Sequence, residues 1–243
     1  MSIFTIEVVA SSVMSCVNAQ QGGAGRIELC SALATAGVTP SSGMLELVKQ
    51  NISIPVYVMI RPREGDFVYD NKEVEVFKRE IELLQKSGAD GFVFGLLKPD
   101  GQIDIALTTA LVKFCHPYPV TFHRAIDCTP DPVRAVGDVI ETGCTRILTS
   151  GGAATGPEGI DTILAMNEYA QGKISIMPGG GIRPETFGQM LNKGIREYHL
   201  SGRVAMPSQT QTNLFDMSRA ETSEASIAQV VKSAGEFFSS EKN

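Results

Sequence analysis

The feature that most constrains the fold of this chain is a regular alternation of short, β-branched runs with longer segments of helical periodicity. Such alternation is typical of βα units joined into a parallel sheet. The expected strands are Ile3–Ala10, Arg26–Cys30, Pro55–Arg61, Gly91–Gly95, Pro119–Arg124, Arg146–Ser150, Ile174–Met177 and Glu197–Ser201. The expected helices between them include Ser12–Gln21, Lys72–Ser87, Asp104–Phe114, Asp131–Thr142, Pro157–Ala170 and Pro184–Asn192.

The connectors between these elements indicate how the sheet closes. Ser87–Asp90, Thr142–Cys144 and Lys193–Ile195 each contain a glycine, follow an expected helix and precede an expected strand. Eight such units in 243 residues fit a single-domain (β/α)8 TIM barrel better than an open Rossmann sheet, whose G-x-G-x-x-G motif does not follow the first strand. We expect one domain over residues 1–243, with a mobile loop at Ser208–Asn213 and a last helix near residues 226–238.

Composition narrows the classes of function. The net charge of −6 is spread without basic blocks, which argues against binding of nucleic acid. No apolar run reaches the length of about 20 residues that spans a membrane, and the first residues lack the basic start of a signal peptide. Five cysteines without a C-x-x-C pair favour a reducing compartment over a disulfide framework. We therefore expect a cytoplasmic protein.

The barrel interior is expected to be charged. Side chains that face the outer helices of a barrel are aliphatic, so the alternate residues of each strand point inward. The inward set contains Glu7, Glu28, Arg61, His123, Glu197 and His199. Barrel interiors are normally filled by Val, Ile and Leu, and active sites lie at the C-terminal ends of the strands. We expect catalytic residues in this set, and a buried structural ion network is the competing interpretation.

Further residues near the strand ends are candidates for binding an anion. Small residues follow the sixth, seventh and eighth strands, where backbone N–H groups can approach a phosphate, although plain turns would also use them. They are Ser150, Gly151, Gly179, Gly180, Gly181, Ser201 and Gly202. Arg61 and Arg63 form a cationic fork after the third strand, and His123 is a candidate acid or base with Asp127 near enough in sequence to orient it.

Several long segments of the chain resemble the CutC copper homeostasis family. They are Ile27–Ser31, Gly37–Ser41, Val58–Arg63 with Gly65–Phe67, Gly91–Gly95, Val120–Ala125, Arg146–Gly151 and Met177–Gly181. The match extends from Glu7 to Ser201. The resemblance implies a cytoplasmic (β/α)8 barrel, often a homo-oligomer, that takes part in copper handling and binds Cu(I).

The resemblance also bears on the position of a metal. Cu(I) prefers thiolate and thioether ligands. Family members proposed to bind copper carry one cysteine on the first strand and another on the second, and here those positions hold Val9 and Cys30. Met59 and His199 are candidate co-ligands of Cys30 if the three side chains converge.

Two classes of function stay open. One is a copper-binding protein with its metal at Cys30. The other is a TIM-barrel enzyme that acts on a small anionic metabolite, phosphorylated or not, with His123 as acid or base and Arg61 as anion clamp. The remaining expected catalytic residues are Glu7, Glu28, Asp127 and His199. A ligand sensor without turnover is a third, plainer alternative.

Overall fold

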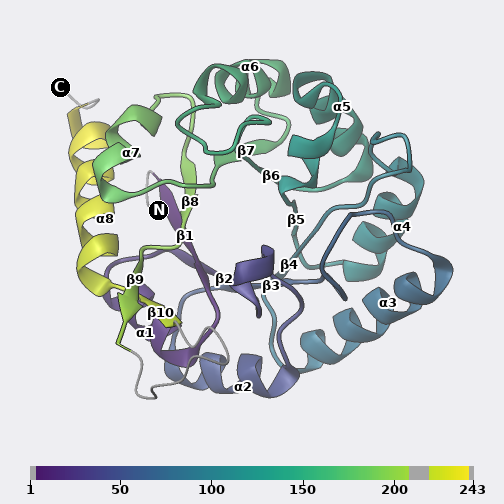
Figure 1. Cartoon of the computed structure of the whole chain (residues 1–243), viewed down its shortest axis with the longest axis horizontal. Coiled ribbons are helices and arrows are strands. Elements are labelled where there is room, and N and C mark those ends of the chain that lie inside the picture. Colours follow the sequence, from purple (N-terminus) through teal and green to yellow (C-terminus); the bar gives the residue numbers. More distant parts are fainter. Residues whose placement is uncertain (1–3, 208–218, 241–243) are drawn as a thin grey trace.

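The computed structural model describes residues 4–207 and 219–240, and its strands form the barrel that the alternation predicts (Figure 1). The strands are β1 (Thr5–Ala10), β2 (Arg26–Leu29), β3 (Val56–Met59), β4 (Gly91–Phe94), β5 (Val120–Phe122), β6 (Arg146–Thr149), β7 (Ser175–Pro178) and β8 (Glu197–Leu200). They pair in parallel in the order β7-β6-β5-β4-β3-β2-β1-β8, and β7 packs beside β8 across the remaining seam. The fold is therefore a (β/α)8 TIM barrel.

Helices surround the strands on the outside of the barrel, as Figure 1 shows. They are α1 (Val13–Gln21), α2 (Ser42–Asn51), α3 (Asn71–Lys86), α4 (Ile105–Cys115), α5 (Pro132–Thr142), α6 (Ile160–Ala170), α7 (Pro184–Met190) and α8 (Glu224–Ser239). Two short 3-10 helices, η1 (Leu33–Thr35) and η2 (Arg124–Cys128), follow β2 and β5. A hairpin of β9 (Arg203–Met206) and β10 (Arg219–Thr222) precedes α8.

These elements agree with the sequence expectation apart from a few boundaries and two additions. The helix expected from residue 157 begins at Ile160, and the one expected up to residue 192 ends at Met190. The helix expected near residues 226–238 extends from Glu224 to Ser239. The additions are α2 and the β9–β10 hairpin, and the loop expected at Ser208–Asn213 lies outside the described residues.

Local capping fixes where the helices begin. The Asp70 side chain accepts hydrogen bonds from the first turn of α3, and the Glu73 carboxylate accepts one from the Asp70 backbone N–H to complete a capping box. Asp131 caps α5 in the same way, with Pro132 at the first helical position. Asp70 ends the loop that follows β3, and Asp131 ends the connection that follows β5. Each cap therefore anchors the end of a loop that begins at the C-terminal end of a strand.

The core has two parts with different chemistry. Ile6, Val8, Ile27 and Leu29 belong to the apolar layer between strands and helices. The intervening Glu7 and Glu28 are also buried, yet their side chains reach His199 inside the barrel. Strand alternation therefore sends aliphatic side chains outward and carboxylates inward, as the sequence predicts.

Candidate functional site

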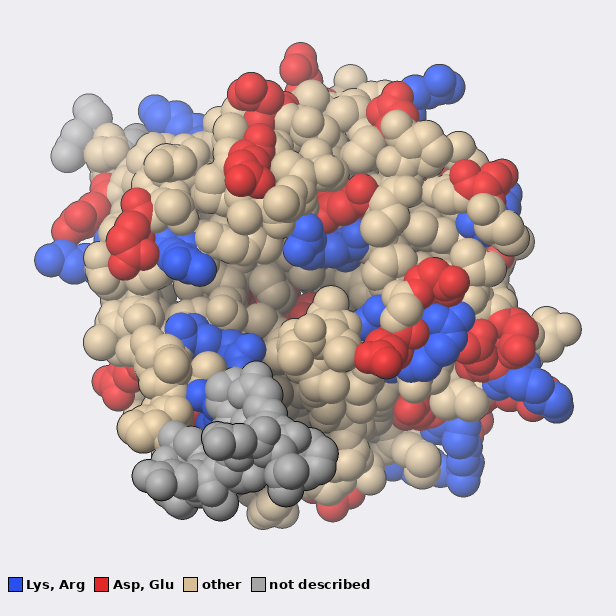
Figure 2. Space-filling model, in the orientation of Figure 1, with Lys and Arg blue, Asp and Glu red and all other residues tan. Residues whose placement is uncertain are grey.

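A cavity of about 350 Å³ opens at the C-terminal ends of the barrel strands. Its lining includes Glu28, Arg61, His123, Arg124, Asp127 and His199. Figure 2 shows a hollow at the centre of this face, with basic side chains on its rim and acidic atoms deep inside. The volume lies at the small end of the range of about 300–1,000 Å³ for ligand pockets, so the cavity suits a small molecule.

Glu7, Glu28 and His199 form the innermost group of the cavity. One ligand atom from each lies within 4.8 Å of the others. Glu7 Oε1 lies 2.8 Å from His199 Nδ1, and Glu7 Oε2 accepts a hydrogen bond from Arg26 Nε. Glu28 Oε2 is buried without a hydrogen-bond partner. Both oxygens of Glu7 therefore have partners, whereas Glu28 Oε2 is able to accept a proton or a hydrogen bond from a ligand.

The environment separates the pKa values of the two carboxyls. Burial raises the pKa of Glu28 to about 7. Burial acts in the same sense on Glu7, but the Arg26 charge and the hydrogen bond with His199 outweigh it and hold the pKa of Glu7 far below its ordinary value. Burial lowers the pKa of His199, but the carboxylates of Glu28 and Glu7 raise it by more. The protein thus favours the protonated forms of both Glu28 and His199 relative to the free side chains.

An ion network beneath this group joins four strands. Glu197 Oε2 accepts bonds of 2.6 Å from Arg26 Nη2 and from Arg146 Nε, and Glu197 Oε1 accepts one of 2.7 Å from Ser175 Oγ. The Tyr57 ring lies under both guanidinium groups, 4.9 and 5.5 Å from their Cζ atoms. Neither Arg26 nor Arg146 was predicted from the sequence, although strand parity places Arg26 on the same face as Glu28.

His123 is held in one tautomer. Its Nδ1 accepts a hydrogen bond of 3.2 Å from the Ala125 N–H, so a neutral ring carries its proton on Nε2. Burial, with the Arg61 charge, lowers the pKa of His123 to about 3. Nε2 is buried without a partner. Asp127, expected to orient this ring, is bonded elsewhere.

Arg61 differs from the anion clamp expected from the sequence. Its Nη1 donates 2.8 Å bonds to the carbonyls of Thr35 and Gly37, and its Nη2 donates one of 2.8 Å to the Gly65 carbonyl. Those carbonyls belong to two loops, the first two to the loop after β2 and the third to the loop after β3. Arg63 is not part of the cavity lining, because its guanidinium pairs with Glu73 and Asp66.

Arg124 is the cation that the structure offers to a ligand. Its Nε donates a 2.9 Å bond to Asp127, and its Nη2 donates one of 2.6 Å to Ser150 Oγ. Asp127 also accepts bonds from Thr149 Oγ1 and from the N–H groups of Ser150 and Gly152. Both carboxylate oxygens of Asp127 therefore already accept hydrogen bonds within the protein. The side chain of Arg124 is 42% exposed, and this residue was not among those predicted from the sequence.

The expected anion-binding loops contribute less than their composition suggests. Among the residues proposed for them, Gly180 lines the cavity. Its φ of +81° favours glycine, and a Cβ there would lie 3.0 Å from Arg124 Nη1. The other members are engaged within the protein. The Gly151 N–H donates to Thr149 Oγ1, and Ser150 Oγ donates to Asp127. Gly179 packs against Leu148, and Gly181 packs against Thr155. The carbonyls of Ser201 and Gly202 accept bonds from Thr222 and Ser223.

The side chains of Cys30 and Met59 converge. They pack with Val9 in a small apolar cluster, and Cys30 is fully buried. Their sulfur atoms lie 3.3 and 2.9 Å from the point that a Cβ on Gly37 would occupy. Burial raises the pKa of the Cys30 thiol well above its ordinary value. His199 lies beside Glu7 and Glu28, so its neighbours are carboxylates rather than the two sulfur atoms.

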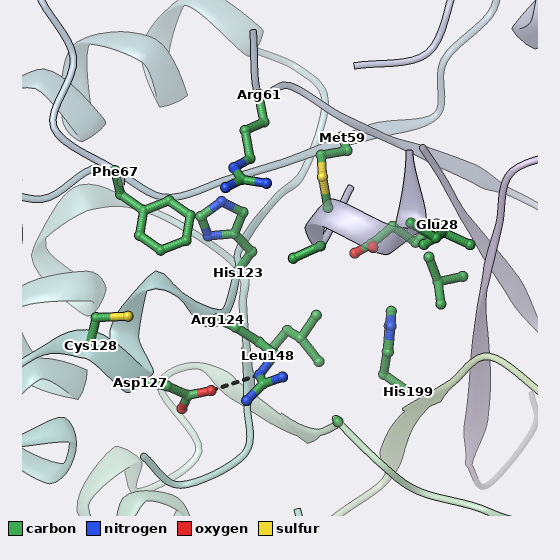
Figure 3. Close-up of a pocket in the computed structure, with 14 residues that line it drawn as sticks. Glu28, Met59, Arg61, Phe67, His123, Arg124, Asp127, Cys128, Leu148 and His199 are labelled. Carbon is green, nitrogen blue, oxygen red and sulfur yellow. Dashed lines mark hydrogen bonds and ion pairs between the residues drawn. The ribbon is translucent and has the colours of Figure 1, made fainter. Parts of the chain in front are cut away.

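Figure 3 shows how the cavity residues face one another. The Glu28 carboxyl points toward the middle of the view, with the His199 ring below it. The ends of Arg61 and His123 lie together beside the Phe67 ring, and the Arg124 guanidinium, bonded to Asp127, enters from the opposite side. The residues of the cavity lining thus include the exposed cation Arg124 and the Glu28 carboxyl with its partnerless oxygen.

Comparisons with known proteins agree on one family. A sequence model of the CutC family matches residues 4–204. The chain is 50% identical over 206 residues to the copper homeostasis protein cutC homolog of Mus musculus, which covers 84% of this chain and 76% of the relative. It is 49% identical over 206 residues to the Homo sapiens homolog, with the same coverage. It is 46% identical over 205 residues to a CutC family protein of Xanthomonas campestris pv. campestris (strain 8004), with 84% and 85% covered.

Solved structures show the same relationship. The putative copper homeostasis protein CutC from Streptococcus agalactiae superposes with a TM-score of 0.76 at 31% identity, covering 81% of this chain and 97% of that one. The thiamine phosphate pyrophosphorylase from Pyrococcus furiosus superposes with a TM-score of 0.61 at 13% identity, covering 96% of each chain. The latter shares the fold alone.

Proposed function

The chain belongs to the CutC copper homeostasis family, and we propose that its cavity binds a small organic anion and moves a proton to and from a carbon atom of that anion. The single observation that carries this proposal is Glu28. This carboxyl is buried at the cavity wall, one of its oxygens lacks a partner, and burial raises its pKa to about 7. A group with such a pKa serves as both acid and base at neutral pH.

Arg124 supports the anionic part of the proposal. The whole chain carries a net charge of −6, so an anion needs a local cation to enter the barrel. Two of the guanidinium nitrogens of Arg124 are held by Asp127 and Ser150, which fixes its direction. Its Nη1 lies beside Gly180, where no side chain intervenes. A carboxylate or phosphate would be bound there, across the cavity from Glu28.

Exchange of hydrogen for deuterium on carbon tests this function while the substrate is still unidentified. The protein is incubated in D2O with a panel of small carboxylates and phosphate esters, and proton NMR follows the loss of each C–H signal. We expect at least one compound to exchange, and Glu28→Gln to slow that exchange by about 100-fold or more. Glu46→Gln, at an exposed position on α2, is the matched control and should exchange at the wild-type rate. A panel with no exchange above the protein-free rate would contradict the proposal.

A second candidate function is binding of Cu(I) at Cys30 and Met59. The observation that favours it is the convergence of their two sulfur atoms beside Gly37. Thiolate and thioether are the ligands that Cu(I) prefers, and the residues Glu28 and His199 are not soft ligands. Because burial raises the pKa of the thiol, Cu(I) would have to displace its proton, and its affinity would increase with pH.

Competition with a Cu(I) chelator such as bicinchoninate tests this candidate. Cys30→Ser should abolish stoichiometric uptake, and Met59→Leu should weaken it. Cys144→Ser, at another buried cysteine, should leave it unchanged. Equal uptake by the wild type and Cys30→Ser would exclude a site centred on Cys30.

Location and assembly complete the proposal. No helix in the described segments is long and apolar enough to cross a membrane. The five cysteines are free, and four of them are buried, which supports a reducing compartment such as the cytoplasm. We propose a homo-oligomer on the family resemblance, and light scattering coupled to gel filtration would measure its mass. A mass of one chain at micromolar concentration would contradict it.

A further inference from the structure

We propose that the anion bound in this cavity also carries a short hydrocarbon tail, which lies against an apolar wall formed by Val9, Leu33 and Met59. The inference rests on the proposed function and deepens it by naming the class of ligand, a small organic acid with an apolar end. The three side chains of the wall line the same cavity as the Arg124 cation.

The apolar wall is separate from the main core of the barrel. Val9, Cys30 and Met59 form a second buried hydrophobic cluster, and Leu33 packs against it. Val9 and Met59 alternate along their strands with residues of the main core, such as Val8 and Val58, so they point to the inside of the barrel. The charged interior of this barrel therefore has one apolar side.

Leu33 reaches the wall from η1, the short helix drawn in dark blue near the centre of the barrel in Figure 1. Two backbone hydrogen bonds of 2.9 Å between Ser31 and Val38 close the loop that carries η1. Arg61 Nη1 donates bonds of 2.8 Å to two carbonyls of the same loop. Arg61 therefore positions the apolar wall, which is in place before a ligand binds.

The backbone at both ends of η1 is strained. Ala32 has φ +49° and Ala36 has φ +67°, in the left-handed region that favours glycine over alanine. Such strain persists only where the surrounding structure enforces it, and it is common at ligand-binding sites. Ala36 itself lines the cavity. The strain supports η1 as part of a binding site rather than as a plain connection.

The apolar wall and the cation face the cavity from different sides. Met59 and Arg124 enter from opposite sides of the view in Figure 3, and Leu148 is drawn between them. Leu148 is a further apolar residue of the cavity lining. A molecule whose acidic group pairs with Arg124 thus has apolar side chains around the rest of its length.

Burial of hydrocarbon then decides which anions bind well. Each methylene that moves from water into apolar surroundings raises affinity by a factor of about four. A polyhydroxylated anion would instead place hydroxyl groups against side chains that cannot hydrogen-bond to them. The cavity therefore favours an acid with an apolar tail, and its volume of about 350 Å³ suits a short one.

A matched pair of probes tests the wall. Pentanoate and 4-hydroxybutyrate have the same charge and length, and they differ only in a terminal methyl or hydroxyl group. NMR titration of the wild type should show about 10-fold tighter binding of pentanoate. Leu33→Asn, which puts a polar group on the wall, should reduce this ratio to about 3 or less. Leu47→Asn, at a leucine of α2 that is 52% exposed, is the matched control and should keep the ratio.

The outcomes separate this proposal from the anion site. Arg124→Gln should weaken both probes by a similar factor and leave their ratio unchanged. Equal wild-type affinity for the two probes would overturn the apolar wall and leave the anion site standing, whereas binding of neither probe would overturn both. An unchanged ratio in Leu33→Asn would also overturn the wall, because the tail would then lie elsewhere.

A contact measurement on the wild type does not depend on how a variant folds. The chain has nine methionines, so ¹³C-methyl-methionine labelling gives few NMR signals, and Met59→Leu identifies the one of interest. The terminal methyl protons of bound pentanoate should show nuclear Overhauser effects to the Met59 methyl group. Bound pentanoate without such an effect would overturn the proposed position of the tail.

Discussion

Glu28 and His199 both bind protons more tightly in the folded protein than in the unfolded chain. Burial raises the pKa of Glu28 from 4.5 to about 7. Burial opposes protonation of His199, but the charges of Glu28 and Glu7 raise its pKa above the ordinary value of 6.5. For a group whose folded-state pKa is raised, the stabilisation is complete below the unfolded pKa and is lost as pH rises through the folded pKa. The two groups therefore make the protein less stable as the pH rises from about 4.5 through 7 and above.

Glu28→Gln should remove much of this pH dependence, because the amide resembles the protonated carboxyl. We expect the variant to exceed the wild type in free energy of unfolding by about 1–3 kcal/mol at pH 8 and to match it at pH 4. Urea unfolding at a series of pH values measures the difference. Glu46→Gln should show no trend with pH. A difference between Glu28→Gln and wild type that is constant with pH would contradict the raised pKa.

The direction of these side chains could be predicted from the sequence, but their partners could not. Strand alternation sends Glu7, Glu28 and His199 inward, because a one-residue shift would put charges among the helices. The same alternation sends Arg61 inward but does not show that the carbonyls of residues 35, 37 and 65 bind it. Those carbonyls come from loops whose paths depend on the whole barrel. The sequence therefore predicts which side chains turn inward, but not the hydrogen bonds that hold Arg61 and leave Arg124 exposed.

At the scale of elements, the loop after β7 shapes the anion end of the cavity. Gly180 has φ +81°, and its missing Cβ leaves Arg124 Nη1 free to approach. Gly180→Ala would strain the backbone and push against that nitrogen. We expect about 1 kcal/mol less stability and about 10-fold weaker binding of any anion that exchanges deuterium, measured by urea unfolding and calorimetry.

Gly188 provides the matched control for this loop. It lies in α7, where an added Cβ meets nothing within 4 Å. Gly188→Ala should raise stability by about 0.5–1 kcal/mol through helix propensity and leave anion binding unchanged. Unaltered binding by Gly180→Ala would place the anion elsewhere than beside Arg124.

Elements were predictable where burial imposes a pattern. The eight barrel strands carry aliphatic side chains on the helix side, so their alternation is strong. In contrast, β9 is mostly exposed, and within α2 the residues Leu45 and Val48 are buried. The pattern of β9 is correspondingly weak. The start of α2, in contrast, carries a local signal that the expectation missed, because the Ser41 side chain accepts a hydrogen bond from the Met44 N–H.

For the whole molecule, the seam between β7 and β8 is where the strand ladder of the barrel is not hydrogen-bonded among the described residues. The hydrogen-bonded ladder of the described strands starts at one side of this seam and ends at the other. Glu197 of β8 crosses it through Ser175 of β7 and Arg146 of β6, and reaches Arg26 of β2 on its other side. The side chain of Glu197, which is 14% exposed, thus links the strands on the two sides of the seam by hydrogen bonds.

Glu197→Gln should weaken this closure, because it leaves Arg26 and Arg146 buried with Glu7 as their remaining carboxylate. Removing one partner from a buried ion network typically costs about 3–5 kcal/mol. The loss should appear as lower global stability in urea and as faster amide hydrogen exchange in β7 and β8 than in β3 and β4. Glu73→Gln, which removes the partner of Arg63 on the outside, should cost far less. If exchange accelerates uniformly around the barrel, Glu197 stabilises the fold as a whole and the seam has no special weakness.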